Sequence, residues 1–466
     1  MIGEDVLYLT VRELAERVRT RAVSPVELTE AYLERSRTIG QRLSAYVTLT
    51  PDLARAEAEQ AAAEIAAGHY RGPLHGVPYA AKDLLAVRGY PTTWGASLFA
   101  DRKFDYDATV IQRLRDAGAV LIGKAAMIEL AGGMGYRFAS ASLTGAARNP
   151  WNTACWTCGS SSGSGAIAAA ALAGFAIGTE TWGSIICPSA FCGASGLRPT
   201  YGRVSRHGAM ALAFSMDKIG PICRAADDCG MVLSAIAGHD PADAASLPDG
   251  GFAYDATSAE PLRIGWLANA WKKLPAPIEA AVNEARQVLA NAGAQISPAE
   301  LPEGPWEVAA GVVVAVEGAS AFGDLIDSGR VAQLTDPVGR IGGYVNQQIP
   351  ASDYLRANRI RGILQRRIDA LFQKFDVLAA ASQPVTAAPL ETNLETGLDY
   401  SDPLGGIGNF CGLPACSVPC GFVNGLPVGI QFVGRVYDDA KVIAAARLFQ
   451  RHTDWNRRRP PGSSSG

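Results

Sequence analysis

The sequence predicts an α/β protein in which helices cover both faces of a large mixed central sheet. Two apolar stretches of strand type, residues 77–81 and 119–122, flank a helical pattern at 108–117. Strands that alternate with helices favour this three-layer α/β/α architecture. The chain has 466 residues, of which 48% are hydrophobic, so it can bury a large core.

Composition argues against several classes of protein. The net charge of −3 gives no electrostatic case for binding nucleic acid or an anionic membrane. No apolar run reaches the length of a membrane span, and residues 1–5 lack signal-peptide features, so we expect a cytoplasmic protein. The five histidines form no metal-binding motif, and we expect the nine cysteines to be free thiols.

The chain begins with a predicted N-terminal helical layer over residues 1–70. Thr10 and Glu13 match a capping box, and Ser24 precedes a proline at the first position of a second helix. An alanine- and glutamate-rich segment at 51–67 supplies the third helix.

Residues 71–237 form the predicted core with the catalytic loops. The strand at 77–81 ends at Lys82. A glycine-rich loop further along carries Tyr136 and Phe138, and loops of this kind often border a pocket.

The second half of the chain gives weaker signals. A polar, turn-forming stretch at 239–252 is the best internal boundary. We expect one domain over residues 1–456. Beyond the core it would contain a variable substrate-side region at 238–375 and strands with a closing helix at 376–456, and a disordered tail at 457–466 would follow.

The most informative stretch runs from Cys158 to Pro188. Four serines stand among glycines, an alanine-rich helix follows at 166–173, and a second polar loop contains Ser184. Alanine favours helices and glycine ends them, so the pattern is loop, helix, short strand, loop. That order can bring Ser160 and Ser184 together although they lie 24 residues apart. A flexible Gly/Ser linker would not contain a packed alanine helix.

Three common motifs offer other interpretations. Residues 118–124 have the spacing of a phosphate-binding loop, but an alanine follows where a hydroxyl residue is required. Residues 215–218 match SxxK without its companion motifs. Residues 159–163 match a GxSxG nucleophile elbow, which would make Ser161 the nucleophile of a Ser-His-Asp esterase with His452 as base.

A base other than histidine is also available. A serine hydroxyl needs an adjacent base, and a buried lysine with a lowered pKa can act as one. Lys82 ends a buried strand, which is where such a lysine is expected, and a second serine could relay the proton. Glycines beside the nucleophile allow backbone N–H groups to point at a developing oxyanion.

On these motifs the chain resembles the amidase signature family. The glycine–serine loop of that family corresponds to residues 158–164, and its nucleophile loop corresponds to residues 179–185. Further matching stretches are Lys82 with Asp83 and residues 72–78, 91–93, 117–124, 148–152, 191–203 and 412–434. The resemblance covers most of the chain and implies the amidase signature fold.

The resemblance implies a mechanism that needs no metal or organic cofactor. Ser184 attacks the carbonyl, and Ser160, preceded by a cis peptide bond, passes the proton to neutral Lys82. Water then resolves the acyl-enzyme. The implied oxyanion hole consists of the backbone N–H groups of Thr181, Trp182, Gly183 and Ser184.

The expected substrate is a small apolar or aryl amide, and relatives in the family also cleave esters and carbamates (urethanes). The predicted pocket residues are Met127, Tyr136, Phe138 and Trp182. Trp182 stands where relatives carry glycine or aspartate, so its indole either lines the pocket or packs away from it. Ile186 stands in place of an arginine that is common in the nucleophile loop of the family. Together with Glu180 and the three consecutive serines at 160–162, it makes the chain look like a stand-alone amidase, which we expect to be a monomer or homodimer. The alternative is an amidotransferase A-type subunit that works in a complex.

Overall fold

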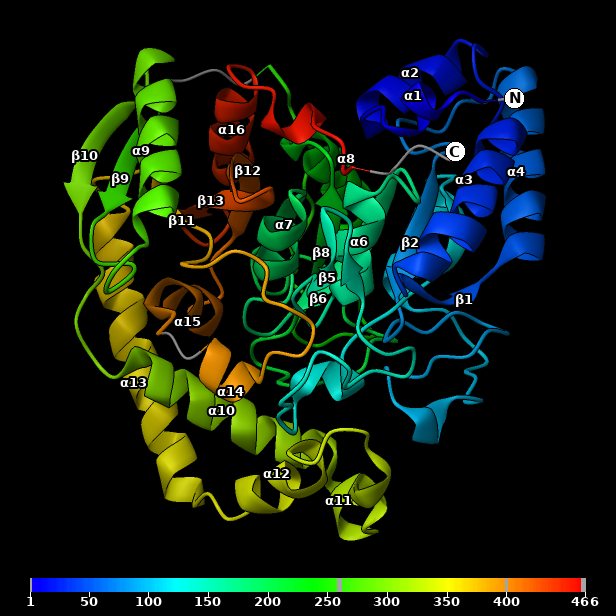
Figure 1. The fold of residues 1–466 in the computed structure, drawn as a ribbon. Helices are drawn as coiled ribbons and strands as arrows, with labels where there is room; N and C mark the ends of the chain where they lie inside the picture. Colours follow the sequence, from blue (N-terminus) through cyan, green and yellow to red (C-terminus); the bar gives the residue numbers. More distant parts are fainter. Residues whose placement is uncertain (1, 258–261, 399–400, 462–466) are drawn as a thin grey trace.

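One mixed sheet of 11 strands organises the computed structural model, which describes residues 2–257, 262–398 and 401–461 (Figure 1). Across the sheet the strands are β1 (Tyr46–Leu49), β3 (Val120–Ala125), β2 (Pro78–Lys82), β6 (Phe175–Glu180), β8 (Lys218–Cys223), β7 (Ser195–Arg198), β12 (Ala415–Val423), β13 (Leu426–Gly434), β11 (Val377–Ala381), β9 (Arg263–Leu267) and β10 (Gln295–Ala299). A separate ribbon pairs β4 (Arg148–Asn149) with β5 (Asn152–Trp156).

The strand directions place the site. Strand β2 runs parallel to both β3 and β6, and Ala81 of β2 is in register with Ile177 of β6. The carboxyl ends of β2 and β6 therefore lie at the same edge of the sheet, where Lys82 ends one strand and Glu180 ends the other. In open α/β sheets, ligands bind beyond this edge.

Helices cover both faces of the sheet, as the sequence predicts. In the N-terminal layer, α3 and α4 pack on each other, and α4 packs on β3. Helices α6 and α7 pack together on one face of the central strands, and α8 and α16 pack together on the other. These helices are α1 (Glu4–Leu7), α2 (Val11–Arg19), α3 (Pro25–Arg35), α4 (Pro51–Ala66), α5 (Thr109–Asp116), α6 (Ser162–Ala169), α7 (Ile186–Cys192), α8 (Ala226–Ile236), α9 (Ala276–Asn291) and α16 (Asp439–Gln450).

Local signals in the sequence account for the helix starts. The Thr10 hydroxyl accepts the N–H of Glu13, and the Glu13 carboxylate accepts the N–H of Thr10, which completes the predicted capping box. The predicted helix at 166–173 begins and ends earlier, as α6, so two of the serines are helical. A Cβ at Gly163 would lie 2.3 Å from the Ala45 carbonyl oxygen, so glycine allows the first turn of this helix to pack against that backbone.

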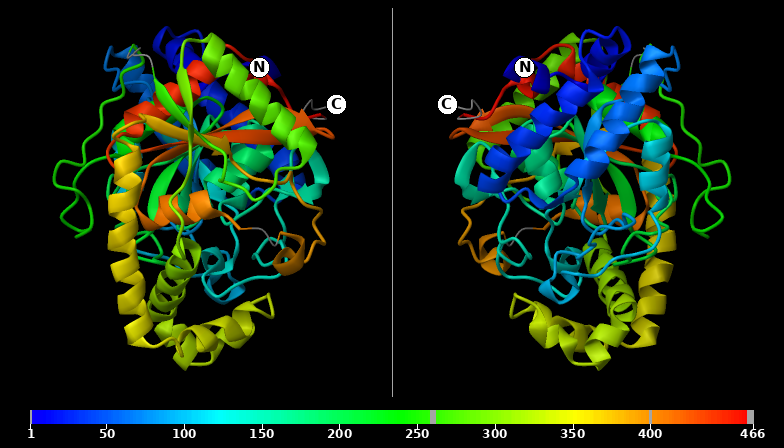
Figure 2. Two further views of the ribbon diagram at one scale, coloured as in Figure 1. Left: turned by 90° about the vertical axis from the view of Figure 1, so that its left-hand side faces the viewer. Right: turned by 90° about the vertical axis from the view of Figure 1, so that its right-hand side faces the viewer.

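The weakly signalled region of residues 302–350 is helical, and it reaches the site. Figure 2 shows these helices extending away from the sheet at one end of the molecule. The Asp336 carboxylate accepts the N–H groups of Arg137 and Phe138, and Glu129 accepts the N–H of Thr335. The elements are α10 (Trp306–Ala321), α11 (Gly323–Asp327), α12 (Gly339–Asn346) and α13 (Ala351–Leu371), and α14 (Leu394–Gly397) and α15 (Pro403–Phe410) follow β11.

Two of the short motifs lie in the sheet. Residues 118–124 run into strand β3, and Lys124 is buried and paired with Asp83 at 2.8 Å, so this stretch is not a phosphate-binding loop. Lys218 of the SxxK match is buried at the start of β8.

The tail differs in part from the prediction. Arg457 pairs with Glu13, and Arg459 pairs with Asp5, so residues 457–461 lie against the N-terminal helices instead of being disordered. Residues 462–466 lie outside the described residues. No helix in the described parts of the chain is long and apolar enough to cross a membrane.

Candidate active site

Lys82 lies at the carboxyl end of β2 and is fully buried. Its Nζ donates to three hydroxyls: Ser160 Oγ at 2.7 Å, Ser161 Oγ at 2.9 Å and Thr179 Oγ1 at 2.9 Å. Burial lowers the pKa of the Lys82 ammonium to about 7, although the negative charges of Asp217 and Glu180 oppose that shift. A substantial fraction of this amine is therefore neutral near pH 7.

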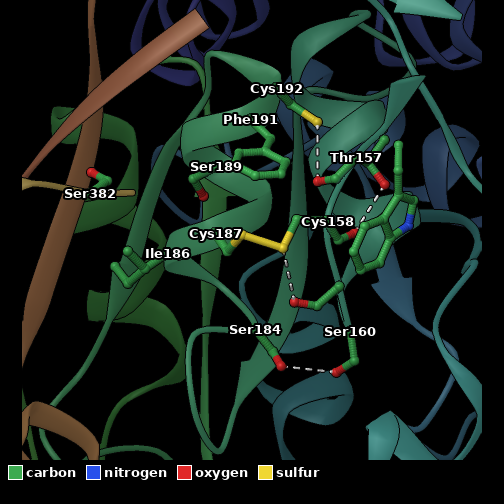
Figure 3. Close-up of a disulfide and its surroundings, with 12 residues drawn as sticks. Thr157, Cys158, Ser160, Ser184, Ile186, Cys187, Ser189, Phe191, Cys192 and Ser382 are labelled. Carbon is green, nitrogen blue, oxygen red and sulfur yellow. Dashed lines mark hydrogen bonds between the residues drawn. A yellow bond between two sulfur atoms is a disulfide. The ribbon is translucent and has the colours of Figure 1, made fainter. Parts of the chain in front are cut away.

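Ser160 connects this lysine to the second serine loop. Ser160 follows a cis peptide bond after Gly159, and its hydroxyl donates to Ser184 Oγ at 3.1 Å (Figure 3). Hydroxyl hydrogens rotate, so the same oxygen–oxygen and oxygen–nitrogen contacts can carry a proton from Ser184 to neutral Lys82. The structure thus brings together the three residues that the sequence nominates, from three separate segments.

Ser161 has a different set of partners. Its hydroxyl accepts from Lys82 and from the N–H of Thr179, and it donates to the Thr179 carbonyl. His452 is exposed, and its ring Nδ1 contacts the Leu448 carbonyl in its own helical turn. The nucleophile-elbow interpretation therefore loses the histidine that it requires at Ser161.

Glu180 fixes the loop that carries Ser184. One carboxylate oxygen accepts the N–H groups of Ile185 and Ile186, and the other accepts from Arg198 and Asn409. Burial alone would raise the pKa of Glu180, but the Arg198 charge and these hydrogen bonds hold it at about 2. This buried carboxylate therefore ties the residues that follow the four-residue loop to Glu180, the residue that precedes it. Neither Arg198 nor Asn409 was nominated from the sequence.

The loop between Glu180 and Ile185 presents free donors. Gly183 has φ +76°, and a Cβ there would meet open space. Thr181 Oγ1 donates to Asp217 at 2.5 Å. Within the described residues, the N–H groups of Trp182, Gly183 and Ser184 donate to no protein acceptor. Unpaired N–H groups beside a serine hydroxyl can bind a developing oxyanion.

A cavity of about 290 Å³ borders both serine loops. Gly159 and Gly183, the neighbours of Ser160 and Ser184, line it together with Tyr136, Trp156 and Trp182. Of the other predicted pocket residues, Met127 is fully buried and Phe138 is half-buried, and neither is part of this lining. A second cavity of about 180 Å³ reaches Thr179 and Thr181.

Trp182 lines the cavity, and a hydrogen bond holds its indole ring. Its Nε1 donates to Asp402 at 3.1 Å, and Asp402 also caps α15 by accepting the N–H of Gly405. A Cβ at Gly406 would lie 3.0 Å from the indole, so the glycine leaves room for the ring against α15. Burial raises the pKa of the Asp402 carboxyl to about 6.

The prediction of free cysteines is wrong for one pair. Cys158 and Cys187 form a disulfide with a Cα–Cα distance of 5.9 Å (Figure 3). Their sequence positions gave no metal or scaffold pattern, and only folding brings helix α7 beside the serine loop. The other seven cysteines are buried free thiols.

This arrangement is what a serine hydrolase with a lysine base requires: a nucleophile, a hydroxyl relay, a lysine of lowered pKa and unpaired N–H donors. In the described residues no three His, Cys, Asp or Glu side chains are grouped to hold a metal ion.

The chain belongs to the amidase family, because the family model described as Amidase matches residues 27–443. It is 37% identical to the A-type subunit of the glutamyl-tRNA(Gln) amidotransferase of Moorella thermoacetica, over 98% of this chain and 99% of the relative. It is 31% identical to the peptide amidase from Stenotrophomonas maltophilia, with a TM-score of 0.83 over 98% and 99% of the two chains. A bacterial aryl acylamidase of the amidase signature family has the same fold, at 24% identity and a TM-score of 0.86, over 97% and 98% of the two chains.

Proposed function

We propose that the chain is an amidohydrolase that cleaves the C–N acyl bond of a small amide through an acyl-enzyme on Ser184. The observation that carries this proposal is the unbroken chain of contacts from Lys82 Nζ through Ser160 Oγ to Ser184 Oγ, at 2.7 and 3.1 Å. Ser184 attacks the carbonyl, its proton moves through Ser160 to Lys82, and the C–N bond breaks as Lys82 returns the proton to the leaving amine. Water then attacks the acyl-enzyme by the same route.

The oxyanion formed in each step is held by backbone N–H groups of residues 181–184. The N–H groups of Trp182, Gly183 and Ser184 support this role, since no acceptor in the described parts of the chain binds them. Glu180 keeps these donors in place by binding the N–H groups that follow Ser184.

The preferred substrates are small apolar or aryl amides, and esters and carbamates (urethanes) are further candidates for the same site. Three aromatic rings, from Tyr136, Trp156 and Trp182, line the cavity beside the serines. Aromatic walls favour flat apolar groups, and the cavity volume of about 290 Å³ limits their size. No metal or organic cofactor takes part in this proposal.

A second candidate function is that of an amidotransferase A-type subunit, which would act in a complex with partner proteins. The 37% identity to the corresponding subunit of the glutamyl-tRNA(Gln) amidotransferase of Moorella thermoacetica favours it. Ile186 in place of an arginine common in the family's nucleophile loop, together with Glu180 and the three serines at 160–162, favours a stand-alone amidase. A cytoplasmic location and a monomeric or homodimeric state stay predictions from the sequence.

The test is a substrate panel with the purified chain and its Ser184→Ala variant. Acetanilides, primary aliphatic amides, aryl esters, aryl carbamates and glutamine are assayed under one set of conditions. We expect Ser184-dependent turnover of anilides above that of aliphatic amides. If aliphatic amides are turned over while anilides and carbamates are not, the proposed preference for aryl substrates is wrong. If glutamine is the one substrate of the panel that is turned over, and partner proteins with ATP stimulate its turnover, the amidotransferase function is supported.

A further inference from the structure

The disulfide joins the two loops that carry the catalytic serines. Cys158 stands two residues before Ser160, and Cys187 stands three residues after Ser184. The bond spans a sequence separation of 29. Figure 3 shows the bond directly above the Ser160–Ser184 contact, with Cys187 on helix α7.

We propose that the Cys158–Cys187 disulfide is a reducible positioning element of the active site, which holds Ser160 against Ser184 and reacts with small dithiols that enter the substrate cavity. The proposal rests on the proposed function, because it assigns the bond a role in that serine relay. Reduction is expected to lower turnover while the protein stays folded.

The Ser160–Ser184 contact beside the disulfide is sensitive to small changes in distance. The Ser160 and Ser184 hydroxyls are 3.1 Å apart, which is long for an O–H···O hydrogen bond. Hydrogen bonds hold other parts of these loops: Ser161 is bonded to Thr179 at the start of the second loop, and Glu180, which binds the N–H of Ile185, is itself bonded to Arg198. A separation larger by about 1 Å would break the relay, and misplacement of that size costs about 10²-fold in rate.

The bond is reachable from the cavity that borders the serines. Cys158 and Cys187 are 7% and 6% exposed, and both line this cavity beside Gly159 and Gly183. In the reaction, the S–S bond breaks, each sulfur gains a hydrogen, and the dithiol is oxidised to its cyclic disulfide. A molecule that enters as a substrate does can thus reach the sulfurs.

The neighbouring thiols are poor exchange partners. Burial raises the pKa of the thiols of Cys155 and Cys192 above their usual range. Because the thiolate is the attacking species, these two cysteines do not displace the bond in the folded protein. Cleavage therefore requires a reductant from outside the chain.

The test measures the reactivity of Ser184 without assuming a substrate. A fluorophosphonate probe is attacked by an activated serine, with fluoride as leaving group, and the labelling rate is compared in oxidised, dithiothreitol-reduced and reoxidised protein. Thiol titration after denaturation counts two additional thiols in the reduced sample. We expect labelling at least tenfold slower after reduction and recovery after reoxidation, with unchanged circular dichroism.

Cysteine variants test the role of the disulfide without requiring a reductant to reach it. Cys158→Ser with Cys187→Ser should label as slowly as the reduced protein, and Cys158→Gly alone should do the same. Cys155→Ser is the matched control, since Cys155 is a free buried thiol in the same segment; it should keep the wild-type rate and its response to reductant. Steady-state assays on an active substrate should show a lower kcat with little change in KM.

The outcomes separate the two proposals. Equal labelling of oxidised protein, fully reduced protein and the folded double variant overturns the positioning role and leaves the proposed function intact. Absence of labelling in the oxidised protein, with no difference from Ser184→Ala, overturns the proposed function itself. Slower labelling caused by unfolding would appear as lost circular dichroism and would also contradict the positioning role.

Discussion

Two neighbouring strands end in a buried charged residue, and the two residues behave in opposite ways. Lys82 ends β2 and Glu180 ends β6, and the strands are parallel partners. Both side chains are fully buried. Yet burial lowers the pKa of Lys82 to about 7, so that it can lose its proton, whereas Glu180 has a pKa of about 2 and keeps its charge.

The difference lies in the partners. Lys82 is surrounded by three neutral hydroxyls, and no carboxylate of the described residues is hydrogen-bonded to it. Glu180 has the Arg198 guanidinium at 2.8 Å in addition to neutral donors. A buried charge without a countercharge in contact tends to neutralise, and a paired one persists. The same edge of the sheet therefore holds a lysine that can lose its proton on one strand and a carboxylate that keeps its charge on the next.

The largest expected effect comes from removing the base. Lys82→Met should lower kcat by at least about 10⁴-fold, because the relay through Ser160 then ends without an amine to accept the proton. Its fold should persist, since Met fills the buried space without a charge. Steady-state kinetics and thermal unfolding check both statements. More than about 1% residual activity would mean that another group serves as base.

Variants of the two serines that contact Lys82 distinguish a serine that relays the proton from one that only supports the lysine. Ser160→Ala should lower kcat by about 10³-fold, because it breaks the path to Ser184. Ser161→Ala is the matched control, since its hydroxyl contacts the same Nζ but bonds onward to Thr179; we expect a loss of about tenfold or less. Equal losses in the two variants, measured as kcat at one pH, would remove the assigned difference.

Neutralising Glu180 should affect stability and activity together. Glu180→Gln leaves Arg198 buried without a countercharge, so the free energy of unfolding should fall by about 3 kcal/mol, and kcat should fall by about 10²-fold as the Ser184 loop loosens. Denaturant unfolding and kinetics measure the two effects.

A remote buried pair provides the control for this variant. Asp439 pairs with Arg203 at 3.1 Å, away from the serine loops. Asp439→Asn should lower stability similarly and leave kcat of the folded protein unchanged. If it lowers kcat as much as Glu180→Gln does, the effect of Glu180 is one of stability alone.

The smallest effect is the pH dependence. Neutral Lys82 is the active form, so kcat/KM should rise with pH, reach half its plateau near pH 7 and fall about tenfold for each unit below that. A pH–rate profile from about pH 5 to 9 checks this. A half-maximal pH near about 10 would mean that Lys82 keeps an ordinary pKa.

Much of the site follows from local sequence. The strand that ends at Lys82, the capping box at Thr10 and the alternation of strands with helices are local patterns, and the structure has all three. The family resemblance nominated Lys82, Ser160 and Ser184, and the hydrogen bonds join them. Thr179, Arg198 and Asp402 were not nominated as site residues, although the first two lie in stretches that match the family, because their contacts with Lys82, Glu180 and Trp182 join separate segments of the chain.

The sequence by itself determined the fold class, because strand and helix patterns are written along the chain. Through its family resemblance it also nominated Lys82, Ser160 and Ser184 as the residues of the proposed relay. Only the tertiary structure decided that Cys158 bonds to Cys187 and that Trp182 lines the cavity on Asp402. It also decided that the pKa of Lys82 falls to about 7, whereas the pKa of Glu180 stays at about 2. The pairing of cysteines, the packing of the residues that line the cavity and the pKa values depend on distances between segments far apart in sequence. These distances are set only when the sheet brings the strand ends together.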